Sequence, residues 1–240
     1  MIPLIGPDDP LPDASRALQR PNGLLAAGGD LRTDRLIAAY RNGIFPWYSA
    51  GEPILWWSPN PRMVLAVADF KLRASLRKRI RQFQEDSSVS LLLDTDFEAV
   101  IRACAAPRDG ASGTWILPEM QAAYIALHRA GHAHSLELRR GSELIGGLYG
   151  VAIGRMFYGE SMFTRESDAS KTALAGLIQL CRDADMPWID CQQQTGHLAS
   201  LGASAIPRAQ FLSGIRTLTR APGPDWRALR STDLLRRIER

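Results

Sequence analysis

Two acidic residues in the second half of the chain stand where carboxylates are uncommon, inside short apolar stretches that are typical of strands. Glu160 lies within residues 157–164 between an aromatic and a sulfur-containing side chain, all on one face if the strand alternates regularly. About thirty residues later, 188–192 carries Asp190 and Gln192 on one face. A carboxylate removed from water costs several kcal/mol unless it is paired, hydrogen-bonded or used in chemistry. We therefore predict that the two strands share a site.

The segments around these strands indicate how they are positioned. Residues 134–140, 143–151 and 157–164 alternate in hydrophobicity and are separated by glycine-containing turns, which predicts an antiparallel meander. A helix with Asp168 as its N-cap follows, and then the strand at 188–192. A strand–helix–strand order requires a parallel crossover, so the two acidic strands are expected in one sheet.

The first quarter of the chain is rich in proline and aromatic residues. Trp47, Trp56 and Trp57 fall within eleven residues. Such a cluster forms either the core of a small domain or a platform on which unpaired bases stack, at about 1–3 kcal/mol per base. We predict an α+β fold with a small N-terminal domain (1–66) and a larger domain (67–240).

A predicted helix at 72–84 carries basic residues at helical spacing. Arg73, Arg77 and Arg81 recur every four residues, and Lys78 and Arg79 lie beside them. Of these, the candidates for binding are Arg73, Arg77, Lys78 and Arg81. A charged helix face is often only solvated, but like charges repel along this one, and no acid offsets them before Glu85. Contact with a polyanion such as RNA is the alternative.

Composition limits the classes of protein that this chain can belong to. Its 240 residues have a formal net charge of +4 and contain three cysteines without a C-x-x-C pair. This pattern argues against a disulfide framework and a zinc site. His128, His132 and His134 look like a cluster, but His128 belongs to a predicted helix and the other two follow Gly131, so we expect no metal site. No stretch approaches the roughly 20 apolar residues of a membrane helix. The N-terminus does not resemble a signal peptide, so we expect a cytoplasmic protein with no membrane partner.

A meander followed by a helix and a further strand resembles the GNAT acyltransferase fold, with a mixed sheet and flanking helices. GNAT enzymes that use acyl-CoA carry a glycine-containing loop before the central helix, and its N–H groups bind pyrophosphate. Residues 164–172 contain no glycine. We therefore expect an acyl donor other than acyl-CoA.

The sequence also resembles the leucyl/phenylalanyl-tRNA–protein transferases over roughly residues 21–212. The resemblance rests on PNGLLAAGGDL (21–31), GIFPW (43–47), PILWWSPNPR (53–62), GTWI (113–116), GHAHS (131–135), GGLYGV (146–151), GESMF (159–163), ASKTAL (169–174), IDCQ (189–192) and SLGA (200–203). It implies an enzyme that moves Leu or Phe, and Met less well, from aminoacyl-tRNA to proteins that begin with Arg or Lys. The products would be degraded by the N-end-rule adaptor and protease. The resemblance implies no cofactor, metal or ATP.

The same resemblance implies roles for the acidic strands. An aminoacyl-tRNA ester is already activated, so the enzyme must mainly align an amine with it and stabilise the oxyanion. The expected roles are Gln192 holding the amine and Asp190 accepting or balancing its proton. Glu160 would hold the cationic acceptor residue or orient the amine.

Further residues are expected to bind the donor. By position, the resemblance implies an apolar pocket for its side chain, formed by Leu148, Phe157, Met162, Leu174, Leu177 and Ile189. Phe157 and Met162 have opposite faces on a regular strand, so both can line the pocket only if a bulge intervenes. Trp47 and Trp115, with Tyr124 nearby, would hold the terminal adenosine and aminoacyl group, and the basic helix would contact acceptor-stem phosphates.

Three other functions stay open from sequence alone. They are an N-acetyltransferase that uses acyl-CoA, a non-catalytic tRNA-binding module, and a tRNA-dependent peptidoglycan transferase. The missing glycine loop opposes the first, and the two carboxylates would have no purpose in the second. The third is usually larger, with a duplicated domain.

Overall fold

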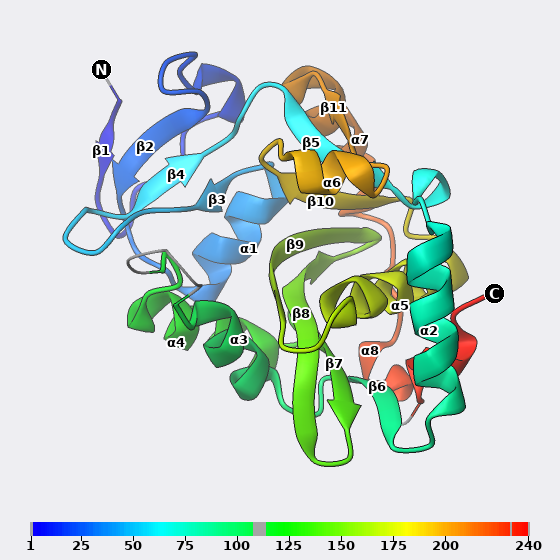
Figure 1. Cartoon of the computed structure of the whole chain (residues 1–240). Helices are drawn as coiled ribbons and strands as arrows, with labels where there is room; N and C mark the ends of the chain where they lie inside the picture. Colours follow the sequence, from blue (N-terminus) through cyan, green and yellow to red (C-terminus); the bar gives the residue numbers. More distant parts are fainter. Residues whose placement is uncertain (1, 108–113, 231, 240) are drawn as a thin grey trace.

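The computed structural model describes residues 2–107, 114–230 and 232–239, so residue 113 of the GTWI stretch lies outside it. Within these ranges the chain forms two sheets flanked by helices (Figure 1). The smaller sheet has the order β1 (Leu4–Ile5), β2 (Leu24–Gly28), β4 (Leu55–Trp57), β3 (Phe45–Pro46). The larger has the order β11 (Ser204–Ile206), β5 (Arg62–Ala66), β10 (Trp188–Gln192), β9 (Met156–Thr164), β8 (Glu143–Ile153), β7 (Ala133–Arg140), β6 (Val89–Leu93). The predicted α+β class with a mixed sheet is confirmed.

The centre of the larger sheet is the predicted meander. β7 pairs with β8, and β8 with β9, both antiparallel. Helix α5 (Ala169–Asp183) then leads to β10, which lies parallel to β9. This parallel pair places Asp190 opposite Tyr158 and brings the end of β10 beside Glu160. The prediction that the two acidic strands share a sheet is therefore confirmed.

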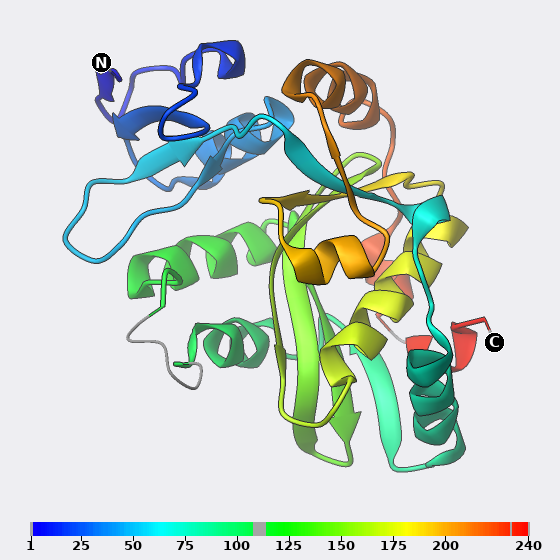
Figure 2. The ribbon, with the colours of Figure 1, turned by 45° about the horizontal axis from the view of Figure 1, so that its top comes forward.

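Helices cover both faces of the larger sheet. Figure 2 shows α3 (Phe97–Ala105) and α4 (Pro118–Arg129) on one face, with α5 and α2 (Ala74–Glu85) on the other. Each side has its own buried apolar cluster. The other helices are α1 (Thr33–Arg41), α6 (Gly196–Ser200), α7 (Arg208–Leu218), α8 (Trp226–Leu229), and the 3-10 turns η1 (Ala14–Arg16), η2 (Val67–Asp69) and η3 (Leu234–Arg237). None of the helices in the described ranges is long and apolar enough to cross a membrane.

Strand β5 joins the N-terminal part of the chain to the larger sheet. It pairs antiparallel with both β10 and β11. Residues 62–66 therefore belong to the larger sheet, although they precede the predicted division between 66 and 67. The division itself stays a prediction.

The structure contains the bulge that the predicted pocket requires. Ser161 pairs with Tyr149 and Gly159 pairs with Gly150, so Glu160 is an extra residue in β9 without an opposite partner in β8. An extra residue reverses the alternation of every side chain beyond it. The simple expectation that residues 156 to 164 alternate regularly was therefore wrong beyond Gly159. Phe157 and Met162 lie on the same face after all.

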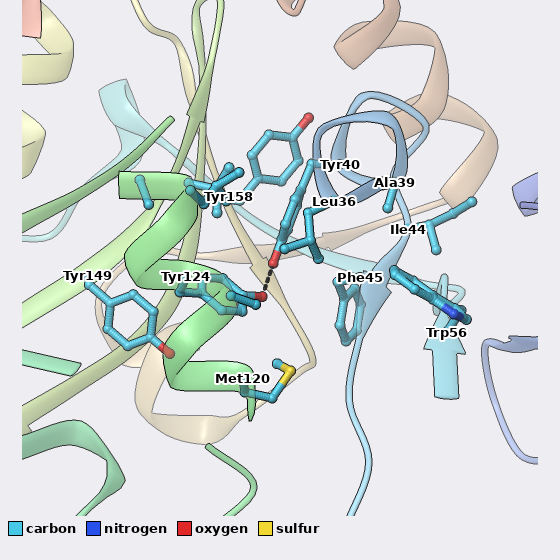
Figure 3. Close-up of a cluster of buried hydrophobic side chains, with 14 of the residues drawn as sticks. Leu36, Ala39, Tyr40, Ile44, Phe45, Trp56, Met120, Tyr124, Tyr149 and Tyr158 are labelled. Carbon is cyan, nitrogen blue, oxygen red and sulfur yellow. Dashed lines mark hydrogen bonds between the residues drawn. The ribbon is translucent and has the colours of Figure 1, made fainter. Parts of the chain in front are cut away.

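The aromatic cluster divides between the two interpretations left open by the sequence. Trp56 is fully buried and its indole N–H donates to the Gly28 carbonyl at 2.9 Å, so it is core (Figure 3). Trp47 is 38% exposed and makes an edge contact with Trp57 at 5.6 Å between ring centroids. Only the exposed part of the cluster is available for stacking.

Asp168 also differs from expectation, since it precedes α5 with φ at 62° and its side chain makes no capping hydrogen bond.

Candidate active site

A cavity of about 590 Å³ opens between the start of α5, the short helix α6 and the bulged part of β9. All six apolar residues expected to form the donor pocket line it, namely Leu148, Phe157, Met162, Leu174, Leu177 and Ile189. The bulge makes this possible, because it returns Met162 to the face that carries Phe157 and Leu148. The residues come from four elements, β8, β9, α5 and β10. An apolar recess of this kind binds a hydrophobic side chain without requiring hydrogen bonds.

Glu160 borders this cavity and is held by three side chains from other elements. The Tyr40 hydroxyl of α1 donates to Oε1 at 2.7 Å, and the Tyr124 hydroxyl of α4 donates to Oε2 at 3.0 Å. The Gln192 amide also donates to Oε1, at 2.8 Å. The two tyrosine hydroxyls also contact each other, drawn as a dashed line in Figure 3. Because each hydroxyl carries one proton, a hydrogen bond between them forms only when one of the two does not donate to Glu160. The carboxylate is therefore fixed in place while it still faces the cavity.

The surroundings of Glu160 shift its protonation into the neutral range. Burial raises the pKa of Glu160 from 4.5 to about 7, and the charge of Asp190 adds to the increase. The hydrogen bonds from Tyr40, Tyr124 and Gln192 oppose it, because they favour the ionised form. Burial also holds the pKa values of both tyrosines well above their usual range, so their hydroxyls stay protonated donors. A carboxyl with a pKa near neutrality can both accept and return a proton at cellular pH.

Asp190 does not share the position of Glu160. Its side chain is completely buried, and both oxygens accept hydrogen bonds from Arg62, at 2.8 Å from Nε and 2.7 Å from Nη2. It is absent from the described lining of the cavity, whereas Gln192 is present. The expectation that Asp190 and Gln192 point the same way into the site was wrong. The pairing of β10 with β5 shifts register between these residues, so the alternation is broken there too.

Gln192 connects the buried pair to the cavity. Its backbone adopts a left-handed conformation with φ at 60°, which non-glycine residues rarely occupy. Its N–H donates to Asp190 Oδ1 at 2.9 Å, and its side-chain amide reaches Glu160. Asp190 thus contacts the rest of the site through the backbone of Gln192.

The expected adenosine-binding residues occupy two different places. Trp47 and Trp115 both line the cavity. Tyr124 is fully buried and donates a hydrogen bond to Glu160, so its contact with the site is through that carboxylate. Phe45 and Pro46 continue the wall that Trp47 begins.

The four basic residues predicted to contact RNA are separate from the cavity. Arg73 precedes α2, and Arg77, Lys78 and Arg81 lie along it. The first, third and fourth are exposed and Arg77 is half-buried. No ion pair found among the described residues includes any of their side chains. Their contact with RNA stays a prediction.

His128 and His134 make contacts outside the cavity. His134 is buried, stacks on Trp226 and shares a hydrogen bond of 2.7 Å with Asp94. His128 stacks on Phe97. Over the described ranges there is no group of three or more His, Cys, Asp or Glu that could hold a metal ion.

Two important residues were missed by sequence reasoning. Tyr40 was not predicted to belong to the site, and Arg62 appeared only as the last residue of the PILWWSPNPR stretch. The partner of each could not be inferred locally, since Tyr40 meets Glu160 and Arg62 meets Asp190 across more than 100 residues of chain. A basic residue inside an apolar strand such as 62–66 was the one available clue for Arg62.

Comparison with known proteins gives this geometry a family. A family model described as leucyl/phenylalanyl-tRNA protein transferase matches residues 64–216, and one for the N-terminal domain of the same proteins matches 29–60. The leucyl/phenylalanyl-tRNA–protein transferase of Bordetella petrii is 58% identical over 232 residues, which cover 95% of this chain and 92% of the relative. That of Methylibium petroleiphilum is 55% identical over 233 residues, covering 95% and 88%.

The solved structure compared with this chain is much less similar than these relatives. L-PGS from Bacillus licheniformis matches with a TM-score of 0.39 at 10% identity, over 70% of this chain and 52% of the other, which is too weak to indicate fold or function. The two family models together cover most of the chain, including both acidic strands and the residues that line the cavity. The chain belongs to the leucyl/phenylalanyl-tRNA–protein transferase family and is an aminoacyltransferase.

Proposed function

We propose that this enzyme moves Leu or Phe, and Met less well, from aminoacyl-tRNA to proteins with an N-terminal Arg or Lys. The modified proteins would then be degraded through the N-end-rule adaptor and protease, in the cytoplasm. The observation that carries the proposal is a carboxylate with a near-neutral pKa at the border of an apolar cavity. Such a cavity suits a hydrophobic aminoacyl group, and such a carboxylate suits proton transfer from an amine.

The donor ester is proposed to occupy the cavity with its side chain inward. Leu, Phe and Met all fit a recess lined by six apolar side chains, and the flexible thioether of Met162 adapts to their different shapes. Trp47 and Trp115 would hold the terminal adenosine by stacking. Tyr124 contributes indirectly, by fixing Glu160.

Glu160 is proposed to handle the proton of the attacking amine. An N-terminal ammonium has a pKa of about 7.7–8, close to that of Glu160, so the proton passes between them at little cost. The neutral amine then attacks the ester carbonyl carbon, and the bond from that carbon to the ribose oxygen breaks. Glu160 passes that first proton to the departing ribose oxygen, which leaves as a hydroxyl. The nitrogen loses a second proton as the amide forms, and Glu160, ionised again, takes this proton and releases it to water.

Gln192 is proposed to orient the amine, and Asp190 to keep Gln192 in place. This modifies the expected relay, because Asp190 is buried and both its oxygens are bonded to Arg62.

A second role for Glu160 is pairing with the cationic side chain of the acceptor. This alternative is favoured by one observation, that Glu160 is the only carboxylate in the described lining of the cavity.

The charged face of α2 is proposed to bind acceptor-stem phosphates. Arg73, Arg77, Lys78 and Arg81 have no anionic partner within the part of the chain that the structure describes. Phosphate contacts of this kind position a nucleic acid without reading its sequence.

A transfer assay tests the proposal. Radiolabelled Phe on charged tRNA, and in parallel radiolabelled acetyl-CoA, are mixed with a peptide that begins with Arg. Matched peptides begin with Ala or with Nα-acetyl-Arg. We expect label from tRNA on the Arg peptide alone. Label from acetyl-CoA, or equal transfer to the Ala peptide, would refute the proposed donor or acceptor.

The two roles of Glu160 give different results in the same assay. If it handles the proton, Glu160→Gln lowers kcat and leaves the preference for Arg over Ala unchanged. If it pairs with the acceptor side chain, the substitution raises KM for the Arg peptide and removes that preference.

A further inference from the structure

Arg62 is the most deeply buried arginine or lysine in the described part of the molecule, with no exposed side-chain surface. Its guanidinium directs three nitrogens to two different segments. Nε and Nη2 donate to the two oxygens of Asp190, and Nη1 donates to the Gly43 carbonyl at 3.1 Å. All three nitrogens of the planar group are therefore used.

Two aromatic rings hold the guanidinium. Its central carbon lies 4.8 Å from the ring centroid of Phe45 and 4.7 Å from that of Phe211. Phe45 itself lines the cavity, while Phe211 belongs to α7 and is not among the described lining residues. These contacts fix the plane of the guanidinium and so the direction of its hydrogen bonds.

The hydrogen bonds of Arg62 connect both walls of the cavity. On one side, Asp190 Oδ1 accepts from Arg62 and also from the N–H of Gln192, whose amide binds Glu160. On the other side, Gly43 has φ at 71° and begins the segment that continues through Phe45 to Trp47. The first wall is where the amine is proposed to react, and the second is where the adenosine is proposed to stack.

We propose that Arg62 is a positioning residue for aminoacyl transfer. By bonding to both Asp190 and Gly43, it holds the left-handed backbone of Gln192 and the Gly43–Trp47 wall in a fixed relative position. The inference rests on the proposed function and adds a residue that contacts neither donor nor acceptor. Stability alone does not explain the pair. Replacing a buried ion pair with apolar side chains of similar volume often leaves a protein equally or more stable.

Paired substitutions separate positioning from stability. Arg62→Met alone leaves Asp190 buried without a partner, and we expect it to lower both the melting temperature and kcat. The double variant Arg62→Met with Asp190→Leu removes both charges. We expect it to melt near the wild-type temperature, yet to transfer Phe to an Arg peptide at least about tenfold more slowly, because misplacement by an ångström costs rate.

Arg62→Lys gives a graded comparison. Lysine keeps the charge but cannot direct three fixed N–H groups, so we expect it to restore stability more than kcat. A matched control is Arg140→Met, which removes ion pairs to Asp86 and Glu166 at the far end of the sheet. Its kcat should stay within about twofold of wild type.

Coupling to Gln192 provides a readout that a purely structural role would not change. If Arg62 acts through Gln192, the paired substitution should slow transfer far less in a Gln192→Ala background than in wild type. A crystal structure of the double variant should show Gln192 out of the left-handed region and separated from Glu160 Oε1.

Wild-type kcat in the double variant, or an unchanged Gln192 conformation, would overturn the inference. The crystallographic result is independent of activity. It would stand even if the wild-type enzyme failed to transfer Phe to the Arg peptide, which would instead refute the proposed function.

Discussion

At the scale of single residues, the site is built around a carboxyl that is partly protonated and partly ionised near neutral pH. Burial raises the pKa of Glu160 to about 7, against 4.5 for an ordinary glutamate. A free α-amino group titrates at about 7.7–8, so donor and acceptor of the proton are closely matched. The three hydrogen-bonding neighbours keep the pKa of Glu160 from rising further, since they stabilise the ionised form of its carboxyl.

The raised pKa of Glu160 predicts how stability depends on pH. Between pH 4.5 and about 7 the folded state binds more protons at this residue than the unfolded state, so its contribution to stability falls as pH rises. The full loss corresponds to at most about 3 kcal/mol. Glu160→Gln does not titrate, so its free energy of unfolding relative to wild type should increase from pH 5 to pH 8. Urea denaturation at both pH values measures this, and a constant difference would contradict the assigned pKa.

The apolar lining predicts a change in donor preference. Leu177 is almost fully buried and lines the cavity. Leu177→Phe reduces the space for the donor side chain, so kcat/KM for Phe should fall about tenfold or more relative to that for Leu. Competition between the two charged tRNAs measures the ratio. An unchanged ratio would place the donor side chain elsewhere.

At the scale of elements, the bulge in β9 decides which side chains meet in the site. Without it, Met162 would face away from the cavity and Glu160 would pair across the sheet. The bulge is adjacent to Gly150 of β8, where an added Cβ would lie 2.2 Å from the Tyr158 carbonyl oxygen and 2.5 Å from the Phe157 ring. A glycine is required there because the backbone of the bulged strand approaches so closely.

Gly150→Ala should therefore destabilise the protein by about 2 kcal/mol or more, through overpacking against a rigid backbone. Gly196→Ala is the matched control. It has ordinary φ and no atom within 4 Å of the added Cβ, so its free energy of unfolding should change by about 0.5 kcal/mol or less. Equal effects would mean that the bulge tolerates a side chain.

The elements also show where prediction from sequence succeeds. The meander, the crossover helix and the strand at 188–192 were predictable because hydrophobic periodicity is a local property. The separate orientations of Asp190 and Gln192 were not, because a register shift depends on the partner strand. A bulge near Phe157 could be inferred only from the conflict between pocket and alternation. Tyr40 and Arg62 act across long sequence distances, so local patterns did not indicate them.

At the scale of the whole molecule, the larger sheet separates two apolar cores and the N-terminal segment closes the site from one side. Tyr40, Trp47 and Arg62 lie in the N-terminal part of the chain, yet each reaches the cavity or the residues that support it. The site therefore needs both parts of the chain. Helix α2, which carries the proposed RNA-binding residues, lies on the same face of the larger sheet as α5, and α3 and α4 lie on the opposite face (Figure 2).

Charge reversal on α2 tests this arrangement. Arg77→Glu with Arg81→Glu should raise Kd for tRNA about tenfold or more and flatten its dependence on salt, because phosphate contacts release counterions. Arg129→Glu is a suitable control, since this residue is exposed, as Arg81 is, but lies on α4. Fluorescence anisotropy over a range of salt concentrations measures both quantities. Equal slopes for all three proteins would remove α2 from the tRNA interface.

The most direct test of the account is the pH dependence of Phe transfer from tRNA to an Arg peptide at saturating substrates, in wild type and Glu160→Gln. Glu160 must be ionised to take the proton, so the wild-type kcat should rise with an apparent pKa near 7. Glu160→Gln should be about a hundredfold slower and lack that rise. A Glu160→Gln enzyme with the rate and profile of wild type would contradict the central role of this carboxylate.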